Sequence, residues 1–395
     1  MKRKENFMKI TIVGIGYVGL SLAKVLARNH DVLCYDIDIE KLKKIDLASI
    51  ENNEVQYFND LHISKAINLE SAYQNAELIF LCVPTNFDEN SKSLDMSCLQ
   101  NALDSVLQYN KNAKVIIKST ISMESIEMIK KYDNQLSIFY SPEFLKENTA
   151  LHDTLFPSRI VLGYVNECDK KVANDLGEFL KNSTELKDVP SIIVPIEEAI
   201  AIKLFSNAYL AMRISFFNEL DSFAQDRHLD TESIIQGVCL DPRIGNWYNR
   251  PSYGFKGYCL PKDTASLSHS FSKTPHPLIQ SILVSNQERI QHSLKRIEDY
   301  IQKNQCQTIG IYRLTMEKEA VSVRFSIMED VIQVLKEKGF IPFIYEPILQ
   351  EASYLNCPVI SFDMLKKCDL IIAIQMNDEL KCVKEKTLIC ISANQ

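Results

Sequence analysis

The chain has 395 residues, enough for two or three domains, and its net charge of −7 argues against a general nucleic-acid-binding protein. Its eleven cysteines contain no C-x-x-C pair and no regular spacing, which argues against a disulfide framework and a zinc site, and we expect no metal. The charged N-terminus lacks an apolar secretory segment and no run approaches the ~20 apolar residues of a membrane span, so we expect a cytoplasmic protein without membrane contact.

The first element, Lys9–Val13, is predicted to be a short apolar strand that leads into a glycine-rich turn. The turn reads Gly-Ile-Gly-Tyr-Val-Gly over residues 14–19, and a helical pattern follows from Leu20 to Arg28. A second strand, Val32–Tyr35, ends directly before Asp36. This order of strand, glycine turn, helix, strand and acid predicts a dinucleotide-binding domain, although a glycine turn alone also occurs in other α/β units.

Each part of this pattern has a physical reason. Gly14 allows the tight turn, Gly16 lets a pyrophosphate approach the backbone, and Gly19 permits close packing of the helix on the strand. Asp36 lies 22 residues after Gly14, where a carboxylate accepts hydrogen bonds from the ribose hydroxyls of the adenosine. The acid favours NAD over NADP, so we expect NAD as the cofactor.

Further strands continue the alternation of strands and helices. They are predicted at 78–83, 115–118, 137–140, 160–163 and 192–194, with a helix at 170–180. Thr85, Thr120 and Glu143 come soon after the first three of these strands. Ligands bind outside the carboxyl ends of strands in open parallel sheets, so these side chains should face the cofactor crevice. Glu147 lies close to Glu143, and such a pair is typical either of a catalytic site or of a solvated helix start.

One long helix is predicted from Glu197 to Arg227, where the sequence has no proline or glycine and places apolar residues at helical spacing. Such a helix would be about 45 Å long, and a helix of this length usually crosses between domains or builds a dimer interface. Lys203 and Asn207 lie four residues apart and share one face. Lys203 is either a catalytic residue or a surface residue that extends its ammonium group to water.

Residues 254–263 read Gly-Phe-Lys-Gly-Tyr-Cys-Leu-Pro-Lys-Asp and place Cys259 after a glycine-bearing loop. A cysteine near positive charge gains thiolate character, and the thiolate is the nucleophile, so Lys262 would favour a reactive Cys259. Asp263 could order a water or a proton beside the thiol. The alternative is that Cys259 is a small buried core residue, as most cysteines are.

The C-terminal part predicts a second βαβ-type unit without a glycine-rich turn. Its strands are predicted at 308–312, 341–345, 370–374 and 388–391, and its helix at 323–338. We therefore expect an α/β fold with two Rossmann-like doubly wound domains, joined by a helical central domain that contains one long helix. The predicted domains are 8–195, 196–300 and 301–395. One would bind NAD and the last a nucleotide-bearing substrate, with the active site at the central helix.

Several longer motifs complete the picture. They are SPEFLKE at 141–147, LFPSRI at 155–160, KLFSNAYLAMR at 203–213, NEL at 218–220, GVCLDPRIGN at 237–246 and GYCLPKD at 257–263, together with GIGYVG, KST at 118–120, and YRLTM and YEP near the C-terminus. With these motifs the chain resembles the UDP-glucose/GDP-mannose dehydrogenase family, and within it the short bacterial UDP-glucose 6-dehydrogenases. The resemblance covers nearly the whole chain from Met8.

The resemblance implies that UDP-glucose is oxidised to UDP-glucuronate in two hydride transfers that use two NAD. Cys259 would be the nucleophile, because a thiolate converts the intermediate aldehyde into a thiohemiacetal and then a thioester. Lys203 and Asn207, with Asp263 and a water, would stabilise the alkoxide and the oxyanion. The catalytic residues implied are Cys259, Lys203, Asn207, Asp263, Glu147 and Thr120, with Glu147 as the base that hydrolyses the thioester.

The resemblance also implies binding residues. Those for the cofactor are Gly14, Gly16, Tyr17, Val18, Gly19, Asp36, Lys41, Thr85, Thr120, Glu147 and Arg324. Those for the substrate are Glu143, Phe144, Leu145, Lys203, Asn207, Arg243, Tyr248, Asn249, Ser252 and Gly257. Arg243 matches an arginine that reaches the site from the other subunit, which implies a homodimer built on the long helix.

Three residues depart from the family pattern: Lys256 replaces a glycine, Glu317 a lysine and Gln375 an arginine. Glycine lets the backbone approach the sugar, so the Lys256 side chain must point away or reshape the pocket. An acid near a diphosphate weakens binding unless Lys318 compensates. Two alternatives therefore stay open: the same chemistry on a UDP-N-acetylhexosamine or GDP-mannose, or a non-catalytic protein that binds NAD and a nucleotide sugar.

Overall fold

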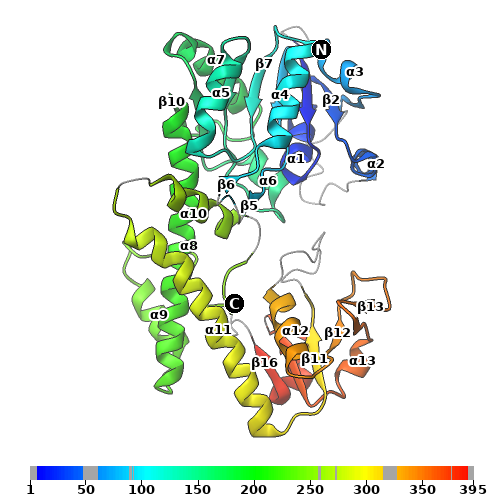
Figure 1. Ribbon diagram of the computed structural model, residues 1–395, viewed down its shortest axis with the longest axis vertical. Helices are drawn as coiled ribbons and strands as arrows, with labels where there is room; N and C mark the ends of the chain where they lie inside the picture. The colour runs from blue at the N-terminus through cyan, green and yellow to red at the C-terminus, as the bar shows by residue number, and fades with distance from the viewer. Residues whose placement is uncertain are drawn as a thin grey trace. The chain divides into compact units, whose positions relative to one another are not determined.

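The computed structural model describes residues 7–47, 61–88, 91, 93–256, 259–271, 274–314, 327–374 and 376–389. The chain forms two compact units, Met1–Phe205 and Ser206–Gln395 (Figure 1). The three-domain division expected from the sequence stays a prediction.

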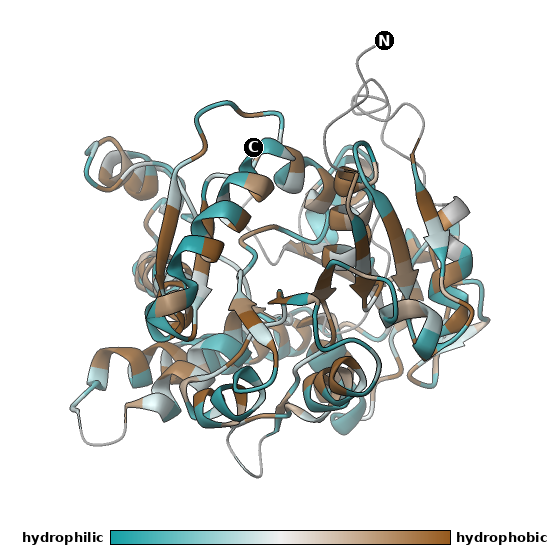
Figure 2. Cartoon of the chain, turned by 90° about the horizontal axis from the view of Figure 1, so that it is seen from above, coloured by the Kyte–Doolittle hydropathy of each residue, from teal (hydrophilic) through white to brown (hydrophobic). Residues whose placement is uncertain are grey.

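The first unit is built on an eight-stranded sheet with the order β10-β9-β8-β7-β4-β1-β2-β3. Its strands are β1 (Lys9–Val13), β2 (Asp31–Tyr35), β3 (Ile63–Lys65), β4 (Leu78–Leu81), β7 (Lys114–Ile117), β8 (Ser137–Tyr140), β9 (Ile160–Tyr164) and β10 (Ser191–Pro195). Every neighbouring pair is parallel except β8 and β9. Figure 2 shows these strands as mostly hydrophobic, in brown, because helices cover both faces of a parallel sheet.

The helices of this unit begin where the sheet strands end. They are α1 (Tyr17–Leu26), α2 (Ile39–Leu47), α3 (Leu69–Tyr73), α4 (Ser97–Tyr109), α5 (Ile126–Asp133), α6 (Ala150–Leu155) and α7 (Lys170–Asn182), and a short hairpin joins β5 (Phe87–Asp88) to β6 (Ser93–Leu94). The main core lies between the sheet and α1 and α7, with Leu22, Leu26 and Leu176 among its buried residues. The carboxyl ends of the parallel strands are thereby held at one edge of the unit.

The long helix α8 (Ile196–Asp226) begins in the first unit and continues into the second. Three further helices follow: α9 (Thr231–Cys239), α10 (Cys259–Ser270) and α11 (Pro277–Asn304). By length and composition α8 could cross a membrane, and 44% of its most apolar window is buried inside the protein. The sequence-based expectation that no run approaches a membrane span is therefore wrong for α8 by this criterion. Core helices of soluble proteins meet the same criterion.

A four-stranded parallel sheet with the order β12-β11-β15-β16 completes the second unit. Its elements are β11 (Ile309–Tyr312), α12 (Ile327–Glu337), β12 (Phe343–Tyr345), β13 (Ser353–Tyr354), β14 (Cys357–Pro358), α13 (Phe362–Leu365), β15 (Leu370–Ala373) and β16 (Thr387–Ile389). Gly339 has a φ of +87°, so a glycine closes the turn after α12. The core of this sheet packs against the second half of α11.

The mixed α/β architecture with a large, mostly parallel sheet and a helical central region is confirmed. One pairing differs from a doubly wound pattern, because β9 runs antiparallel to β8. The chain between these two strands contains only the short helix α6, which packs against α1. An antiparallel neighbour needs no crossover helix on the sheet face, so the chain can turn back at this point.

Candidate functional site: a dinucleotide turn and two buried polar pairs

The turn between β1 and α1 is shaped by its three glycines. Gly14 has a φ of +91°, and a Cβ there would lie 2.5 Å from the carbonyl oxygen of Cys82. A Cβ at Gly19 would lie 2.0 Å from the carbonyl oxygen of Gly14. A Cβ at Gly16, in contrast, would meet no atom within 4 Å. Gly14 and Gly19 are therefore required by packing, whereas the space at Gly16 is open.

Helix α1 starts directly after this open position, with Tyr17 and Val18 half-buried in its first turn. The first backbone N–H groups of a helix have no partner within the helix, and its N-terminus attracts negative charge. An open glycine at a helix N-terminus fits the pyrophosphate of a dinucleotide. This arrangement is what NAD binding requires of the turn.

Asp36 lies at the carboxyl end of β2 and is buried. Its Oδ2 atom accepts a hydrogen bond of 2.7 Å from the Ile15 N–H, and its Oδ1 atom accepts one of 2.9 Å from the Asp38 N–H. The Lys41 ammonium lies 3.8 Å from Oδ2. The carboxylate is thus fixed beside the glycine turn, and its remaining lone pairs can accept ribose hydroxyls. Arg324, the other predicted cation of the cofactor site, lies outside the described residues.

The carboxyl ends of β4 and β7 bring predicted cofactor residues together. The Thr85 hydroxyl donates a 2.8 Å hydrogen bond to the carbonyl oxygen of Thr120, and both residues are buried. The Ser119 hydroxyl donates to the carbonyl oxygen of Val83 at 2.6 Å. These contacts join two segments that are about 35 residues apart in sequence, at the sheet edge where the glycine turn also lies.

Lys203 of α8 is buried and makes an ion pair with Glu143, which follows β8. The ammonium lies 3.1 Å from Glu143 Oε1 and donates at 2.7 Å to the carbonyl oxygen of Glu143. The Phe144 ring centroid is 5.6 Å from the ammonium, and the Leu145 N–H donates to Glu143 Oε2 at 3.2 Å. Lys203 is therefore not a surface lysine, and Glu143 is not part of a solvated helix start. Glu147, in contrast, is exposed.

Lys118 belongs to the same cluster, and the sequence analysis did not assign it a role. It follows β7 directly and donates a 3.2 Å hydrogen bond to the hydroxyl of Ser141, which follows β8. Burial lowers the pKa of Lys118 to about 8, and the neighbouring Lys203 acts in the same direction while Glu143 opposes it. Its place in the KST motif was the available signal, but only the pairing of β7 with β8 reveals the neighbours.

The second unit holds a buried polar pair that includes the next predicted residue of α8. Asn207 of α8 donates from Nδ2 to Asp263 Oδ2 at 2.6 Å, and the Lys262 ammonium lies 3.5 Å from Asp263 Oδ1. All three side chains are buried. Cys259 is the first residue of α10, four residues before Asp263, and is half-buried. Cys259 is therefore not a core residue, and Lys262 is engaged by Asp263.

The predicted substrate residues between α9 and α10 lie in an irregular segment. Tyr248 adopts a φ of +48°, a conformation that side chains rarely take and that is common at functional sites. Asn249 is buried and donates to Cys239 Sγ and to Asn246 Oδ1. The Arg243 side chain is 88% exposed and pairs with Asp241 at 2.7 Å. Gly257 and Tyr258 lie outside the described residues.

Lys256 takes the first of the two options that its departure from glycine allowed. Its ammonium makes a 2.6 Å ion pair with Asp330 in the first turn of α12. The side chain is thus directed to the C-terminal sheet's helix. The other two departures, Glu317 and Gln375, and the neighbouring Lys318 lie outside the described residues.

The YRL and YEP motifs meet at the carboxyl ends of β11 and β12. The Arg313 N–H donates to the carbonyl oxygen of Tyr345 at 2.7 Å, and the Leu314 N–H donates to Glu346 Oε2 at 2.7 Å. Glu346 is buried. This parallel sheet, like the first, therefore places its motifs at the edge where ligands of such sheets bind.

The glycine turn, its open helix N-terminus and the fixed Asp36 define the protein as one that binds NAD. Comparison with known families specifies it further. Residues 8–180 match the NAD binding domain of the UDP-glucose/GDP-mannose dehydrogenase family, and residues 197–288 match the central domain of that family. The chain belongs to the UDP-glucose/GDP-mannose dehydrogenase family.

Similar proteins cover nearly all of the chain. A UDP-glucose 6-dehydrogenase of Campylobacter jejuni is 39% identical, covering 96% of this chain and 97% of that protein, and one of Streptococcus pneumoniae is 36% identical, covering 96% and 98%. Among solved structures, a UDP-glucose dehydrogenase from Pyrobaculum islandicum has a TM-score of 0.81 at 23% identity, covering 94% of this chain and 91% of that one. A UDP-N-acetyl-mannosamine dehydrogenase from Staphylococcus aureus has a TM-score of 0.75 at 19% identity, with coverages of 92% and 88%.

The glycines make the first prediction. Gly19→Ala should unfold or strongly destabilise the protein, because its methyl group would overlap the Gly14 carbonyl. Gly16→Ala should keep the wild-type melting temperature but weaken NAD binding about tenfold or more, since the methyl group enters the space for the pyrophosphate. Thermal melting and NAD titration by calorimetry measure both. Equal melting temperatures for the two variants would contradict the packing argument.

The second prediction concerns how the contribution of Lys118 to stability changes with pH. Its ordinary pKa is 10.5 and its folded pKa about 8, so the folded protein binds fewer protons between these values. The wild type should therefore gain stability relative to Lys118→Met as pH rises from about 8 towards 10, and show its largest deficit at pH 7. Urea denaturation of both proteins at each pH measures this difference. Lys171→Met, at an exposed position of α7, is the control and should show no such trend. A pH-independent difference for Lys118→Met would refute the shift.

Proposed function

We propose that the chain oxidises UDP-glucose to UDP-glucuronate in two NAD-dependent steps. The observation that carries the proposal is that one helix, α8, bears two buried polar pairs one turn apart, Lys203 with Glu143 and Asn207 with Asp263. The second pair lies on α10, the helix that Cys259 opens. The names of the relatives from Campylobacter jejuni and Streptococcus pneumoniae support the substrate.

In the first step the sugar 6-hydroxyl loses a proton to water and its carbon loses a hydride. NAD supplies the hydride acceptor when bound. Lys203, held by Glu143, would stabilise the alkoxide with its ammonium group, and Asn207 would donate its remaining N–H. Asp263 would order the water that takes the proton, with Thr120 assisting the transfer.

In the second step the Cys259 thiolate adds to the aldehyde carbon and forms a thiohemiacetal. Loss of a second hydride gives a thioester, and water cleaves it to the carboxylate and the free thiol, with Glu147 as the base. The position of Cys259 in the first turn of α10 supports this role, because a helix N-terminus favours the negative charge of a thiolate.

The same chemistry on another nucleotide sugar is the second candidate. It stays a candidate because Lys256 replaces a glycine of the family pattern, while the ion pair with Asp330 directs its side chain towards α12. The solved UDP-N-acetyl-mannosamine dehydrogenase has the same fold, so the fold does not select among sugars. Activity with a UDP-N-acetylhexosamine or GDP-mannose, and none with UDP-glucose, would favour this candidate.

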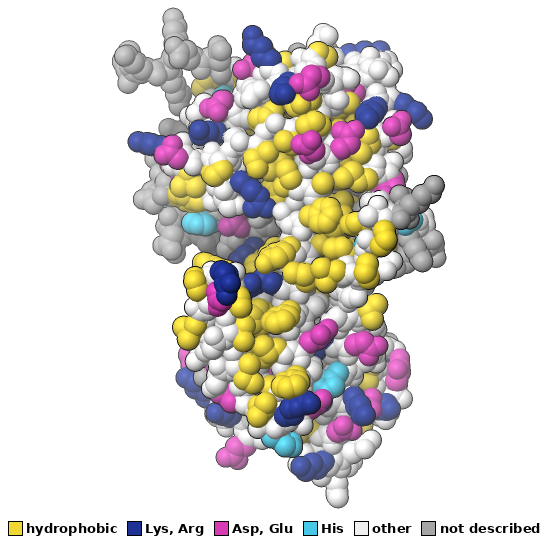
Figure 3. Space-filling model, turned by 90° about the vertical axis from the view of Figure 1, so that its left-hand side faces the viewer, with side chains coloured by type: hydrophobic (Ala, Val, Ile, Leu, Met, Phe, Trp, Pro, Cys, Tyr) yellow, Lys and Arg dark blue, Asp and Glu magenta, His cyan; other side chains and the backbone are white. Residues whose placement is uncertain are grey.

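A homodimer completes the proposal. Tyr209, Phe216 and Phe223 follow one another at seven-residue spacing on α8, and each is more than half exposed. Figure 3 shows hydrophobic side chains, in yellow, gathered over the face where α8 and α9 lie. An apolar stripe of this kind is typical of a helix that pairs with a second copy. Arg243, 88% exposed, would then reach the site of the other subunit.

The reaction makes the third prediction. Purified protein with excess NAD should form two NADH per UDP-glucose and release UDP-glucuronate, because each oxidation transfers one hydride. Cys259→Ser should lower UDP-glucuronate formation by at least about a thousandfold, since an alcohol replaces the thiolate nucleophile. Cys168→Ser, at an exposed cysteine of the first unit, is the control and should behave as wild type. A full NADH yield from Cys259→Ser would reject the role of Cys259.

The fourth prediction concerns the proposed homodimer. Arg243→Ala and Cys259→Ser should each be inactive in UDP-glucuronate formation. When co-expressed in equal amounts they should recover about a quarter of the wild-type rate, because half of the dimers are mixed and each mixed dimer holds one intact site. An arginine that serves its own subunit would leave the mixture inactive. Phe216→Glu should shift the protein to a monomer in sedimentation analysis.

A further inference from the structure

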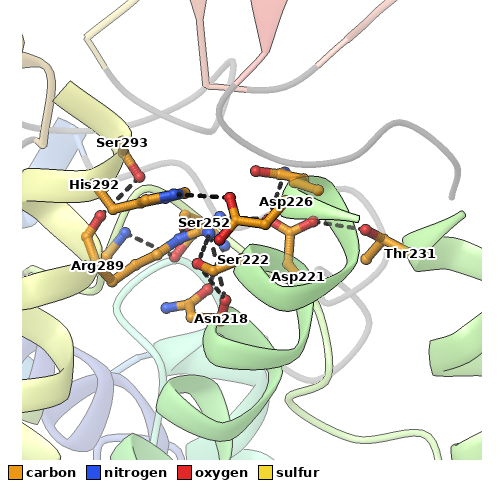
Figure 4. Close-up of polar contacts among 11 residues, drawn as sticks. Asn218, Asp221, Ser222, Asp226, Thr231, Ser252, Arg289, His292 and Ser293 are labelled. Carbon is orange, nitrogen blue, oxygen red and sulfur yellow. Dashed lines mark hydrogen bonds and ion pairs between the residues drawn. The ribbon is translucent and has the colours of Figure 1, made fainter. Parts of the chain in front are cut away.

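The segment Ser252–Phe255, which leads towards Cys259, is held by side chains from α8 and α11. The Ser252 N–H donates to Asn218 Oδ1 at 2.7 Å, and Arg289 Nε donates to the Ser252 carbonyl oxygen at 2.7 Å. Figure 4 shows the Arg289 guanidinium directed from α11 towards Ser252 and towards Asn218 and Ser222 on α8. Both backbone polar groups of Ser252 are thus bound by buried side chains.

The other end of the segment is held in the same way. Asn286 accepts a 2.8 Å hydrogen bond from the Phe255 N–H and donates at 3.0 Å to the Phe255 carbonyl oxygen. Gly254, between them, has a φ of +131°, and a Cβ there would lie 2.5 Å from Ile290 Cγ1. The segment therefore packs closely against α11. The side-chain amide of Asn286 pairs with both backbone polar groups of Phe255, as the backbone of a neighbouring strand would.

Arg289 is only 4% exposed, and its charge is fully engaged. Nη2 lies 2.5 Å from Asp221 Oδ2, and Nη1 donates to the Ser222 hydroxyl at 2.7 Å. Asp221 in turn accepts a 2.8 Å hydrogen bond from the Thr231 hydroxyl at the start of α9. A buried ion pair contributes little net stability because both charges lose water, but a fully bonded one fixes a single geometry.

The packing of α8 against α11 does not by itself require this polar network. Ala211 on α8 and Ile282 on α11 are buried in one apolar cluster together with Phe255. The polar network fixes the orientation of the segment, since Arg289 Nε and the Asn286 amide bind only backbone atoms of the segment. Cys259 lies four positions after Phe255, so a displacement of the segment would shift Ser252 and alter the approach to the thiol.

We propose that Asn286 and Arg289 are positioning residues for the reaction: they fix the backbone of residues 252–255 and so preset the nucleotide-sugar contacts and the approach to Cys259. The inference deepens the proposed function and rests on it for the roles of Ser252 and Cys259. Neither residue touches the reacting atoms in this scheme. They act through the segment that they hold.

Two variants test this. Asn286→Ala removes both bonds to Phe255 without changing charge. Arg289→Lys keeps the charge beside Asp221 but cannot also supply the planar donors to Ser252 and Ser222. The matched controls lie on the same helix: Asn304→Ala at its end and Arg296→Lys at an exposed position. If Arg289→Lys does not fold, Asn286→Ala alone decides, because it buries no unpaired charge.

Three measurements are made on each folded variant: amide hydrogen exchange of residues 252–256, the alkylation rate of Cys259 by iodoacetamide, and kinetics with UDP-glucose and NAD. We expect exchange at least about tenfold faster, a changed alkylation rate, and a KM for UDP-glucose about tenfold higher with an unchanged KM for NAD. The controls should match the wild type in all three.

Unchanged exchange would overturn the proposal. So would faster exchange with wild-type alkylation and kinetics, since the network would then be a structural support only. If the wild type itself does not turn over UDP-glucose, the proposed function fails, and the exchange and alkylation data still decide whether Asn286 and Arg289 preset the segment that leads to Cys259.

Discussion

The structure depends on how the buried polar side chains of α8 are paired. An ammonium group loses several kcal/mol of solvation when it is buried, and Glu143 offsets this cost for Lys203 with both a carboxylate and a carbonyl oxygen. One turn later Asn207 meets Asp263 in the same way. Between them and in the next turn the buried side chains are apolar, with Leu204, Ala208 and Ala211, and buried polar residues return further along the helix at Asn218 and Asp221. The proposed chemistry uses the first of these polar stretches, and the second binds Arg289 and the Ser252 backbone.

The sheet edges explain why residues far apart in sequence act together. In a parallel sheet all carboxyl ends lie on one side, so the loops after β1, β2, β4, β7 and β8 converge. The glycine turn, Asp36, Thr85 and Lys118 are brought to one edge by this rule. The antiparallel return of β9 ends the series, and Glu143 lies in the loop where the chain turns back. The change in strand direction thus coincides with the residue that pairs with Lys203.

The second unit uses a different device for its irregular segments. Loops such as 240–256 have no ladder to satisfy their backbone, so side chains supply the missing partners. Arg213 donates to the carbonyl oxygens of Ile244, Gly245 and Trp247, just as Arg289 and Asn286 bind the later part of the loop. Arginine suits this task because its donors form a rigid planar fork. These hydrogen bonds give the loop a defined backbone conformation, although it forms no strand.

The sequence by itself determined the features that depend on local periodicity and on special backbone conformations. The strand at 137–140 and the long helix, expected at 197–227 and found at 196–226, follow from side-chain spacing. The tight turn at Gly14 was predicted from the glycine pattern and has the positive φ that it requires, and the motifs identified the family.

Tertiary structure alone decided the contacts between distant residues. Lys256 and Asp330 are 74 residues apart, Arg289 and Asp221 68, and Lys118 and Ser141 23. The antiparallel pairing of β9 belongs to the same group. None of these leaves a local signal, because a polar side chain looks the same in sequence whether it faces water or a buried partner. Only the packing of helices and strands removes the water and selects the partner.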